Sequence, residues 1–176
     1  MHDTEHDPAP TSVTVQDTRF GEVTVHLENQ ETLVVDGEKV PRVEIVRAAE
    51  SEKDDHIAIG TRDPRHLTMS VDGETVELRP GKGRLSRSSY RVDVTYDGKS
   101  YRLRPDSIPS SRFTRDGVRM GDFSSDGDGL VIAEWREEAE VAAADAAVAY
   151  ALAAAFGTGG QPMWIMAVDA VGAAVP

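Results

Sequence analysis

The part of the sequence best suited to chemistry is a segment rich in arginine. Between positions 79 and 119 there are eleven Lys and Arg residues and four acids, so this segment carries a charge of +7 while the rest of the chain carries −19. Such a concentration of cations attracts anions. We therefore expect a site for an anionic ligand, a lipid headgroup or a partner protein, formed by Arg84, Arg87, Arg91, Arg102 and Arg104. The alternative is that these side chains are the outward positions of solvated strands.

The sequence contains none of the common catalytic motifs. There is no G-x-S-x-G elbow, no G-x-x-x-x-G-K-[ST] phosphate loop and no H-E-x-x-H, and the absence of cysteine excludes thiolate nucleophiles and thiolate metal sites. The five histidines include no pair at helical i, i+4 spacing. We expect no catalytic residue, no metal site and no cofactor, and an enzyme is the least favoured class of function.

One acidic segment, SSDGDGLVIAEW, imitates a calcium-binding loop. An EF-hand loop starting at Ser124 would place Asp126 and Asp128 at ligand positions three and five. Serine then stands at the first position, where the loop needs aspartate, and Trp135 stands at the twelfth, one residue after Glu134. Two consecutive turns explain this segment better than a calcium site does.

Charge and the first residues restrict the choice of partner and compartment. A net charge of −12 argues against general binding to nucleic acid, which needs Lys and Arg to neutralise phosphates. The beginning, MHDTEHDPAP, is acidic and lacks the apolar core of a secretion signal, so we expect a cytoplasmic protein. We expect residues 1–12 to form a disordered tail and residues 13–176 to form a single domain.

Four Asp-Gly pairs indicate how the chain folds. They occur at Asp36, Asp72, Asp97 and Asp116, each between short runs rich in β-branched, aromatic or alternating residues. Asp-Gly supplies the positive φ angles that tight hairpin turns require. No helical period appears before Trp135, so the hairpins predict an antiparallel meander and no parallel βαβ units.

The alanine-rich segment AEVAAADAAVAYALAAAF predicts a helix over residues about 136–156. Glu134, Glu137 and Glu138 would occupy its first turn, and Gly157 is suited to end it. This helix is apolar on all sides, so a soluble chain must cover it completely. We expect the meander to close around it, because closure also removes the exposed strand edges. Asp145 must then be paired inside the barrel, or bind a ligand in a cavity.

An antiparallel meander of about 10–12 strands closed around one hydrophobic helix near the C-terminus resembles the tubby C-terminal-domain-like superfamily, with its phospholipid scramblase and LURP-one-related branches. The resemblance covers about residues 13–157 and rests on the hairpin spacing and the helix. It implies a closed β-barrel around a central helix. It also implies a lipid-headgroup or membrane-associated role, which some of these proteins have, but it carries over no site residue.

The last part of the sequence, QPMWIMAVDAVGAAVP, predicts a short second helix over about residues 162–175. It is apolar apart from Asp169 and too short to cross a bilayer. It can pack over an open end of the barrel, mediate self-association into a homo-oligomer, or make peripheral membrane contact. Two functions therefore remain: a non-enzymatic module that binds an anionic ligand or partner, and an assembly protein that self-associates through this helix.

Overall fold

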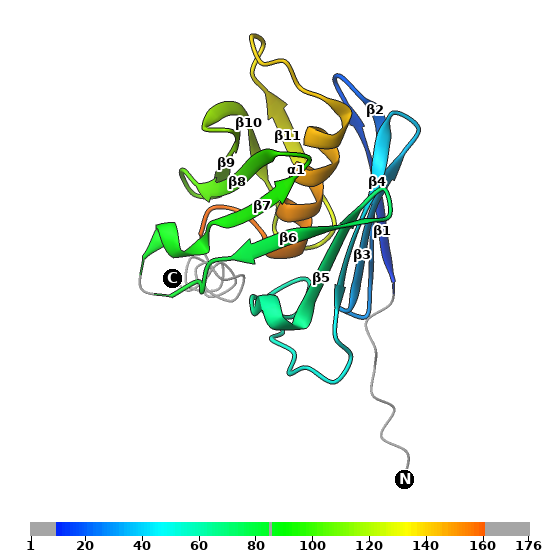
Figure 1. The fold of residues 1–176 in the computed structure, drawn as a ribbon, viewed down its shortest axis with the longest axis vertical. Coiled ribbons are helices and arrows are strands. Elements are labelled where there is room, and N and C mark those ends of the chain that lie inside the picture. Colours follow the sequence, from blue (N-terminus) through cyan, green and yellow to red (C-terminus); the bar gives the residue numbers. More distant parts are fainter. Residues whose placement is uncertain (1–9, 85, 161–176) are drawn as a thin grey trace, which may run out of the picture.

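The computed structural model describes residues 10–84 and 86–160. Eleven strands and one α-helix follow one another, with two short 3₁₀ helices between strands (Figure 1). The strands are β1 (Thr11–Asp17), β2 (Gly21–Glu28), β3 (Thr32–Gly37), β4 (Val40–Arg47), β5 (Leu67–Val71), β6 (Glu74–Pro80), β7 (Val92–Tyr96), β8 (Lys99–Pro105), β9 (Ser110–Arg115), β10 (Val118–Ser124) and β11 (Ile132–Trp135). The helices are η1 (Pro64–His66), η2 (Arg87–Tyr90) and α1 (Ala143–Phe156).

Each strand pairs antiparallel with the next one along the chain, so the sheet is the expected meander. The mainly β fold class is confirmed. At Asp72, Asp97 and Asp116 the Asp-Gly pair forms the two central residues of the hairpin turn, and both residues have positive φ. Since few residues other than Gly, Asn and Asp accept this conformation, these three turns set the register of six strands.

The fourth Asp-Gly pair forms a hairpin in a different way. Asp36 and Gly37 belong to β3, and the turn itself consists of Glu38 and Lys39. A Cβ atom at Gly37 would lie 2.6 Å from the carbonyl oxygen of Glu22 on the neighbouring strand. Glycine is therefore needed here for close approach of two strands, at a point where the register shifts between Val35 and Gly37.

The barrel is nearly but not completely closed. Among the described residues, the two edge strands β1 and β11 do not pair with each other. Side chains join the two edges instead. The carboxylate of Asp17 accepts hydrogen bonds from Trp135 Nε1 at 2.8 Å and from the Tyr150 hydroxyl at 2.6 Å. The ring of Phe20 meets that of Trp135 edge to face, with centroids 6.4 Å apart. A buried polar group thus closes the gap that backbone hydrogen bonds leave.

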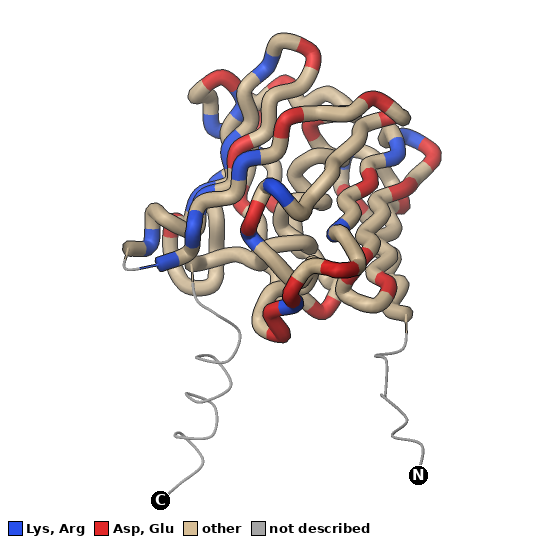
Figure 2. Tube along the Cα trace, turned by 60° about the horizontal axis from the view of Figure 1, so that its bottom comes forward, with Lys and Arg blue, Asp and Glu red and all other residues tan. Residues whose placement is uncertain are grey.

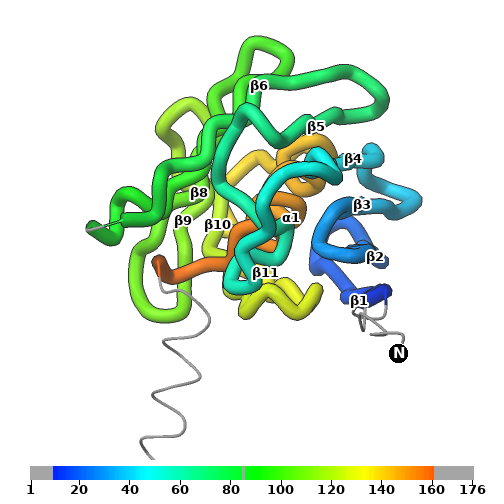
Figure 3. Tube along the Cα trace, turned by 90° about the horizontal axis from the view of Figure 1, so that it is seen from below, coloured from blue at the N-terminus to red at the C-terminus, as the bar shows by residue number. Residues whose placement is uncertain are grey.

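Helix α1 lies inside the barrel, as Figure 3 shows from below. Every residue from Asp145 to Phe156 is buried, and the alanine side chains let β3 and β4 approach closely. Around the helix lie inward-facing strand residues such as Leu33, Ile45 and Phe113. The expected central helix is confirmed. In the part of the chain that the structure describes, no helix combines the length and apolar character needed to cross a membrane.

The helix begins at Ala143, seven residues later than we predicted. Arg19 donates to the carbonyl oxygens of Arg136 and Ala139, and Arg115 donates to that of Glu140. These contacts hold the segment in a non-helical course that includes a turn at Glu137 and Glu138. Asp145 then accepts a hydrogen bond from the backbone N–H of Ala142 at 2.8 Å and caps the first turn. The prediction of glutamates in the first turn is therefore wrong.

Two further predictions concern the ends of the chain. Strand β1 begins at Thr11, two residues before the expected start of the domain. Residues 1–9 of the predicted tail and the predicted helix at about 162–175 lie outside the described residues. Helix α1 ends at Phe156 beside the connections that precede β5, β7 and β9, and we call this end of the barrel, at the bottom of Figure 1, the lower end.

Candidate functional site

The basic residues of the arginine-rich segment fall into two groups. Six of the eleven form ion pairs with carboxylates: Arg79, Arg91, Arg102, Arg112, Arg115 and Arg119. The other five have no carboxylate partner among the described residues: Lys82, Arg84, Arg87, Lys99 and Arg104. Figure 2 shows that Lys and Arg gather along one side of the barrel.

The paired group lies mainly on the outer face of the sheet. Arg102 in β8 donates to Asp93 in β7 through Nε at 2.7 Å and Nη2 at 3.2 Å, and Arg91 lies 3.6 Å from the same carboxylate. Two of the five predicted site residues, Arg91 and Arg102, therefore share one carboxylate, which leaves about one net positive charge on this group. Arg104 differs, because the register places it directly opposite Arg112, another cation.

The unpaired group lies mainly at the lower end. Lys82, Arg84 and Arg87 belong to the connection between β6 and β7, where Gly83 N–H donates to the carbonyl oxygen of Ser89 at 2.9 Å. A Cβ atom at Gly160 would lie 2.9 Å from Arg87 Cγ and about as close to Pro105, the residue after Arg104. The fold therefore brings three of the predicted site residues, Arg84, Arg87 and Arg104, to one end of the barrel.

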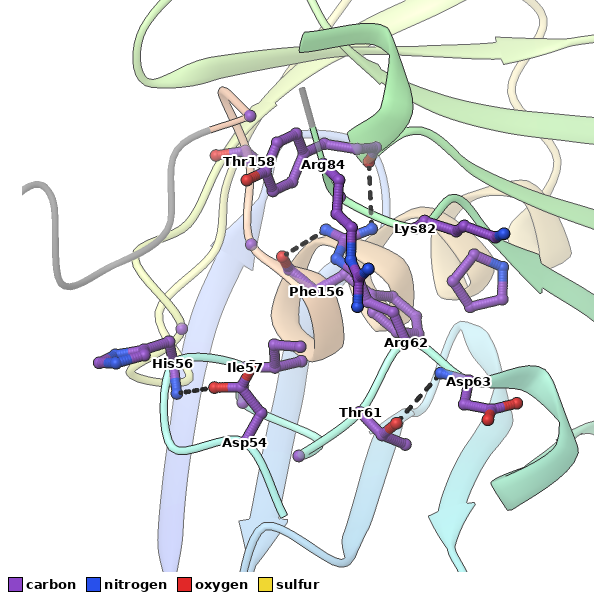
Figure 4. A pocket seen from close by; sticks show the side chains of 18 of the residues that line it. Asp54, His56, Ile57, Thr61, Arg62, Asp63, Lys82, Arg84, Phe156 and Thr158 are labelled. Carbon is purple, nitrogen blue, oxygen red and sulfur yellow. Dashed lines mark hydrogen bonds between the residues drawn. The ribbon is translucent and has the colours of Figure 1, made fainter. Parts of the chain in front are cut away.

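A cavity of about 1180 Å³ opens at this end, beside the last turn of α1. Arg62, Lys82 and Arg84 line one side of it, and Asp54 and Asp63 lie on the opposite side (Figure 4). Apolar groups also line the cavity: Ile57, Ala58, Pro64, Pro80, Tyr90, Pro105 and Phe156. Further charged side chains of both signs line it as well: Glu52, Lys53, Arg65 and Asp126. The cavity thus combines charged groups of both signs with apolar surface, and small-molecule sites commonly pair apolar surface with a few charged or polar groups.

Arg62 is the most deeply placed cation of the cavity. Its guanidinium carbon lies 5.1 Å from the ring centroid of Tyr90 and 5.5 Å from that of Phe156. Its N–H groups donate to the carbonyl oxygens of Gly81, Tyr90 and Phe156 over 3.3–3.4 Å. Burial lowers the pKa of Arg62 from 12.5 to about 10, partly offset by the nearby Tyr90. None of these partners is a carboxylate.

The acid next to Arg62 in sequence does not neutralise it. Asp63 accepts hydrogen bonds from the Arg65 side chain, with Nη2 and Oδ2 2.7 Å apart, and also from the Arg65 backbone. The Arg65 hydrogen bonds hold the pKa of Asp63 at about 2. Within the described residues, Arg62 forms no ion pair. Sequence reasoning missed Arg62, because a single arginine between a threonine and an aspartate gives no sign of burial.

A second buried charge, Asp145, belongs to the fold itself. Its carboxylate pairs with Arg115 and accepts a hydrogen bond from the Tyr101 hydroxyl at 2.7 Å. Burial, then the hydrogen bond to Asp145, raises the pKa of Tyr101 well above its usual range. The expectation that Asp145 is paired inside the barrel is confirmed, and its completed set of partners makes it structural.

The described residues contain no group of three or more His, Asp or Glu placed to hold a metal ion, and this includes the acidic turns around Asp126 and Asp128. A scan against protein-family models, a search of curated proteins and a search of solved structures each give no match to this chain.

Proposed function

We propose that this protein is a binding module whose lower end receives an anionic ligand. The observation that carries the proposal is the separation of paired from unpaired cations. Lys82, Arg84, Arg87 and Arg104 have no carboxylate partner in the described part of the chain. Lys82 and Arg84 line one cavity, and Arg87 and Arg104 adjoin two of its lining residues, Gly160 and Pro105. Cations that the protein itself leaves unneutralised are the ones available to an anion.

The paired arginines contribute much less to such a site. Arg91 and Arg102 share Asp93, so the local charge of this group is close to that of a single cation. An incoming anion would have to compete with that carboxylate. We therefore leave Arg91 and Arg102 out of the proposed site and keep Arg84, Arg87 and Arg104 in it, at the lower end.

The architecture also supports a proposal of kinship with the tubby C-terminal-domain-like superfamily. Both have an antiparallel meander wrapped around a hydrophobic helix near the C-terminus. If the chain is a member, lipid headgroups become one source of the anion, and a soluble polyanion is another.

The test compares two double variants that change the charge equally. Arg84→Glu with Arg87→Glu reverses two cations at the lower end, and Lys39→Glu with Arg42→Glu reverses two exposed cations at the β3–β4 hairpin. Retention on immobilised heparin and on phosphatidylserine-containing vesicles is measured at low and high ionic strength. Exposed charges are screened within about 10 Å at 0.1 M salt, so binding should weaken as salt rises.

The proposal expects heparin or the vesicles to retain the wild type and the Lys39→Glu/Arg42→Glu variant at low salt. The Arg84→Glu/Arg87→Glu variant should not be retained. Retention on heparin and vesicles alike indicates an anion site, and retention on vesicles alone indicates a lipid source. Equal losses in the two variants would show that net charge alone governs retention. If the wild type is retained by neither material, the proposal is wrong.

A further inference from the structure

We infer that the lower-end cavity is a binding site for a small amphiphilic anion, with Arg62 as the group that receives the charge. The inference rests on the proposed function, since it concerns the same end of the barrel. It adds a partly buried cation, Arg62, to the exposed cations of the same cavity, and it names the class of ligand: one carboxylate, sulfonate or phosphate on a compact apolar body.

The first argument concerns the charge of Arg62. The Arg62 guanidinium is partly removed from water, and neutral carbonyl groups restore the lost solvation only in part, especially over 3.3–3.4 Å. Its pKa of about 10 reflects this incomplete compensation. A ligand anion in the cavity would supply the missing negative charge. Because charge-assisted hydrogen bonds are about twice as strong as neutral ones, Arg62 would favour an anion over a neutral molecule of the same shape.

The second argument concerns the direction in which Arg62 is held. The rings of Tyr90 and Phe156 lie against the guanidinium, and Phe156 belongs to the rigid last turn of α1. The Nε atom donates no hydrogen bond to the described residues. A side chain fixed in this way loses little further freedom when it binds, which favours affinity.

The third argument concerns space next to Arg62. Gly83 has a φ of +67°, and a Cβ atom there would lie 3.1 Å from Arg62 Cδ and from Tyr90 Cε1. Any side chain at this position would displace the guanidinium or the ring. Glycine therefore allows the β6–β7 connection to lie directly over Arg62 and places Lys82 and Arg84 at the cavity wall.

The fourth argument concerns the rest of the cavity. Ile57, Ala58, Pro80 and Phe156 offer apolar surface within the same space. A volume of about 1180 Å³ is somewhat larger than the roughly 300–1,000 Å³ typical of small-ligand pockets, so a small ligand would occupy only part of it. An extended polyanion would meet the exposed arginines of the rim, whereas a small molecule with an apolar body can bury that body beside the rings.

The probe is 8-anilinonaphthalene-1-sulfonate, an aromatic anion whose fluorescence rises on burial, compared with N-phenyl-1-naphthylamine, its uncharged counterpart. Both are titrated into the full-length protein and into the variants Arg62→Met, Arg62→Lys and Lys39→Met. Lys39→Met is the matched control, because it also replaces one cation by methionine, at the exposed β3–β4 hairpin. Melting temperature and far-ultraviolet circular dichroism show whether each variant is folded.

The inference expects saturable binding of the sulfonate to wild type and to Lys39→Met, and weaker binding of the uncharged compound. Arg62→Met should raise the dissociation constant of the sulfonate about tenfold or more, and Arg62→Lys should raise it less. Binding of the uncharged compound should change little. If Arg62→Met does not fold, two measurements still test the inference. They are the affinity of the wild type for the sulfonate relative to the uncharged compound, and the dissociation constant of the sulfonate for Arg62→Lys.

Two results would overturn the inference. One is equal affinity of wild type for the charged and the uncharged compound. The other is an unchanged dissociation constant in a folded Arg62 variant. Neither result affects the proposed function, which heparin and vesicle retention measure through Arg84 and Arg87. Conversely, a wild type that binds the sulfonate at Arg62 but is retained by neither heparin nor vesicles would support the cavity site and contradict the proposed function.

Discussion

At the end where α1 begins, the fully buried carboxylate of Asp145 lies against Arg115 and a tyrosine hydroxyl. At the end where α1 finishes, the partly buried guanidinium of Arg62 meets carbonyl oxygens and aromatic rings. The first charge has a charged partner within the protein. The second does not, among the described residues, and it adjoins a cavity. A buried charge with a complete set of partners holds a fold together, and one that lacks an opposite charge beside open space is a candidate for ligand binding.

The strongest test of this contrast is Asp145→Ala. It removes the only carboxylate that Arg115 pairs with in the described residues and leaves the Tyr101 hydroxyl without its acceptor. Breaking a buried ion pair typically costs about 3–5 kcal/mol, so we expect the free energy of unfolding to fall by that amount. Urea denaturation followed by circular dichroism measures it. A loss below about 1 kcal/mol would show that the pair is not structural.

Alkaline pH gives the next largest effect. Burial and the hydrogen bonds to Asp145 and Asp17 raise the pKa of Tyr101 and Tyr150 far above 10. Above pH 10 the unfolded chain loses these two protons and the folded chain keeps them, so stability falls as pH rises, by about 1.4 kcal/mol per pH unit for each phenol. Absorbance at 295 nm should show both phenols ionising only when the protein unfolds. Ionisation of all four tyrosines in the folded protein would contradict this.

Arg62→Met should cost much less, about 1 kcal/mol. The substitution leaves no charge behind, only three carbonyl oxygens that can turn to water in the cavity, and methionine keeps part of the contact with the two rings. The same denaturation measurement applies. A loss as large as that of Asp145→Ala would remove the difference between the two ends, because it would mean that Arg62 is as structural as the Asp145 pair.

Arg102→Gln sets the baseline for an exposed pair. Its partner Asp93 retains Arg91 at 3.6 Å, and half of the Arg102 side chain is in water. Exposed ion pairs contribute about 0–1 kcal/mol, so the change in unfolding free energy should be small. A loss above about 2 kcal/mol would indicate that the outer face of β7 and β8 stabilises the barrel, and would place Arg102 with the structural charges.

The sequence predicts the local features of this fold well and the long-range ones unevenly. The hairpin turns at Asp72, Asp97 and Asp116 depend on the residue types of only four consecutive positions each, so these turns can be inferred directly from the sequence. The pairing of Asp145 follows from burial alone, although Arg115 as its partner does not. The start of α1 is set by Arg19, which is distant in sequence and donates to the carbonyl oxygens of residues 136–139. No local pattern records such a contact.

The candidate site shows the same limit. A cluster of arginines in sequence predicts a positive region, and Figure 2 agrees with it. Whether each arginine is free depends on which acids the strand register brings near. Asp93 neutralises Arg102 because β7 and β8 pair with those two residues opposite each other. Arg62 lies outside the cluster, and only the meeting of α1 with the β6–β7 connection buries it.

The place of α1 in the chain has a consequence for synthesis. All eleven strands leave the ribosome before the helix that fills the space between them, and at about 5–20 residues per second the helix follows β1 by on the order of ten seconds. During that time hairpins can form, because each strand pairs with its neighbour, but the inner faces carrying Leu33, Ile45 and Phe113 have nothing to enclose. A nascent chain that stops before Ala143 should therefore bind chaperones or aggregate.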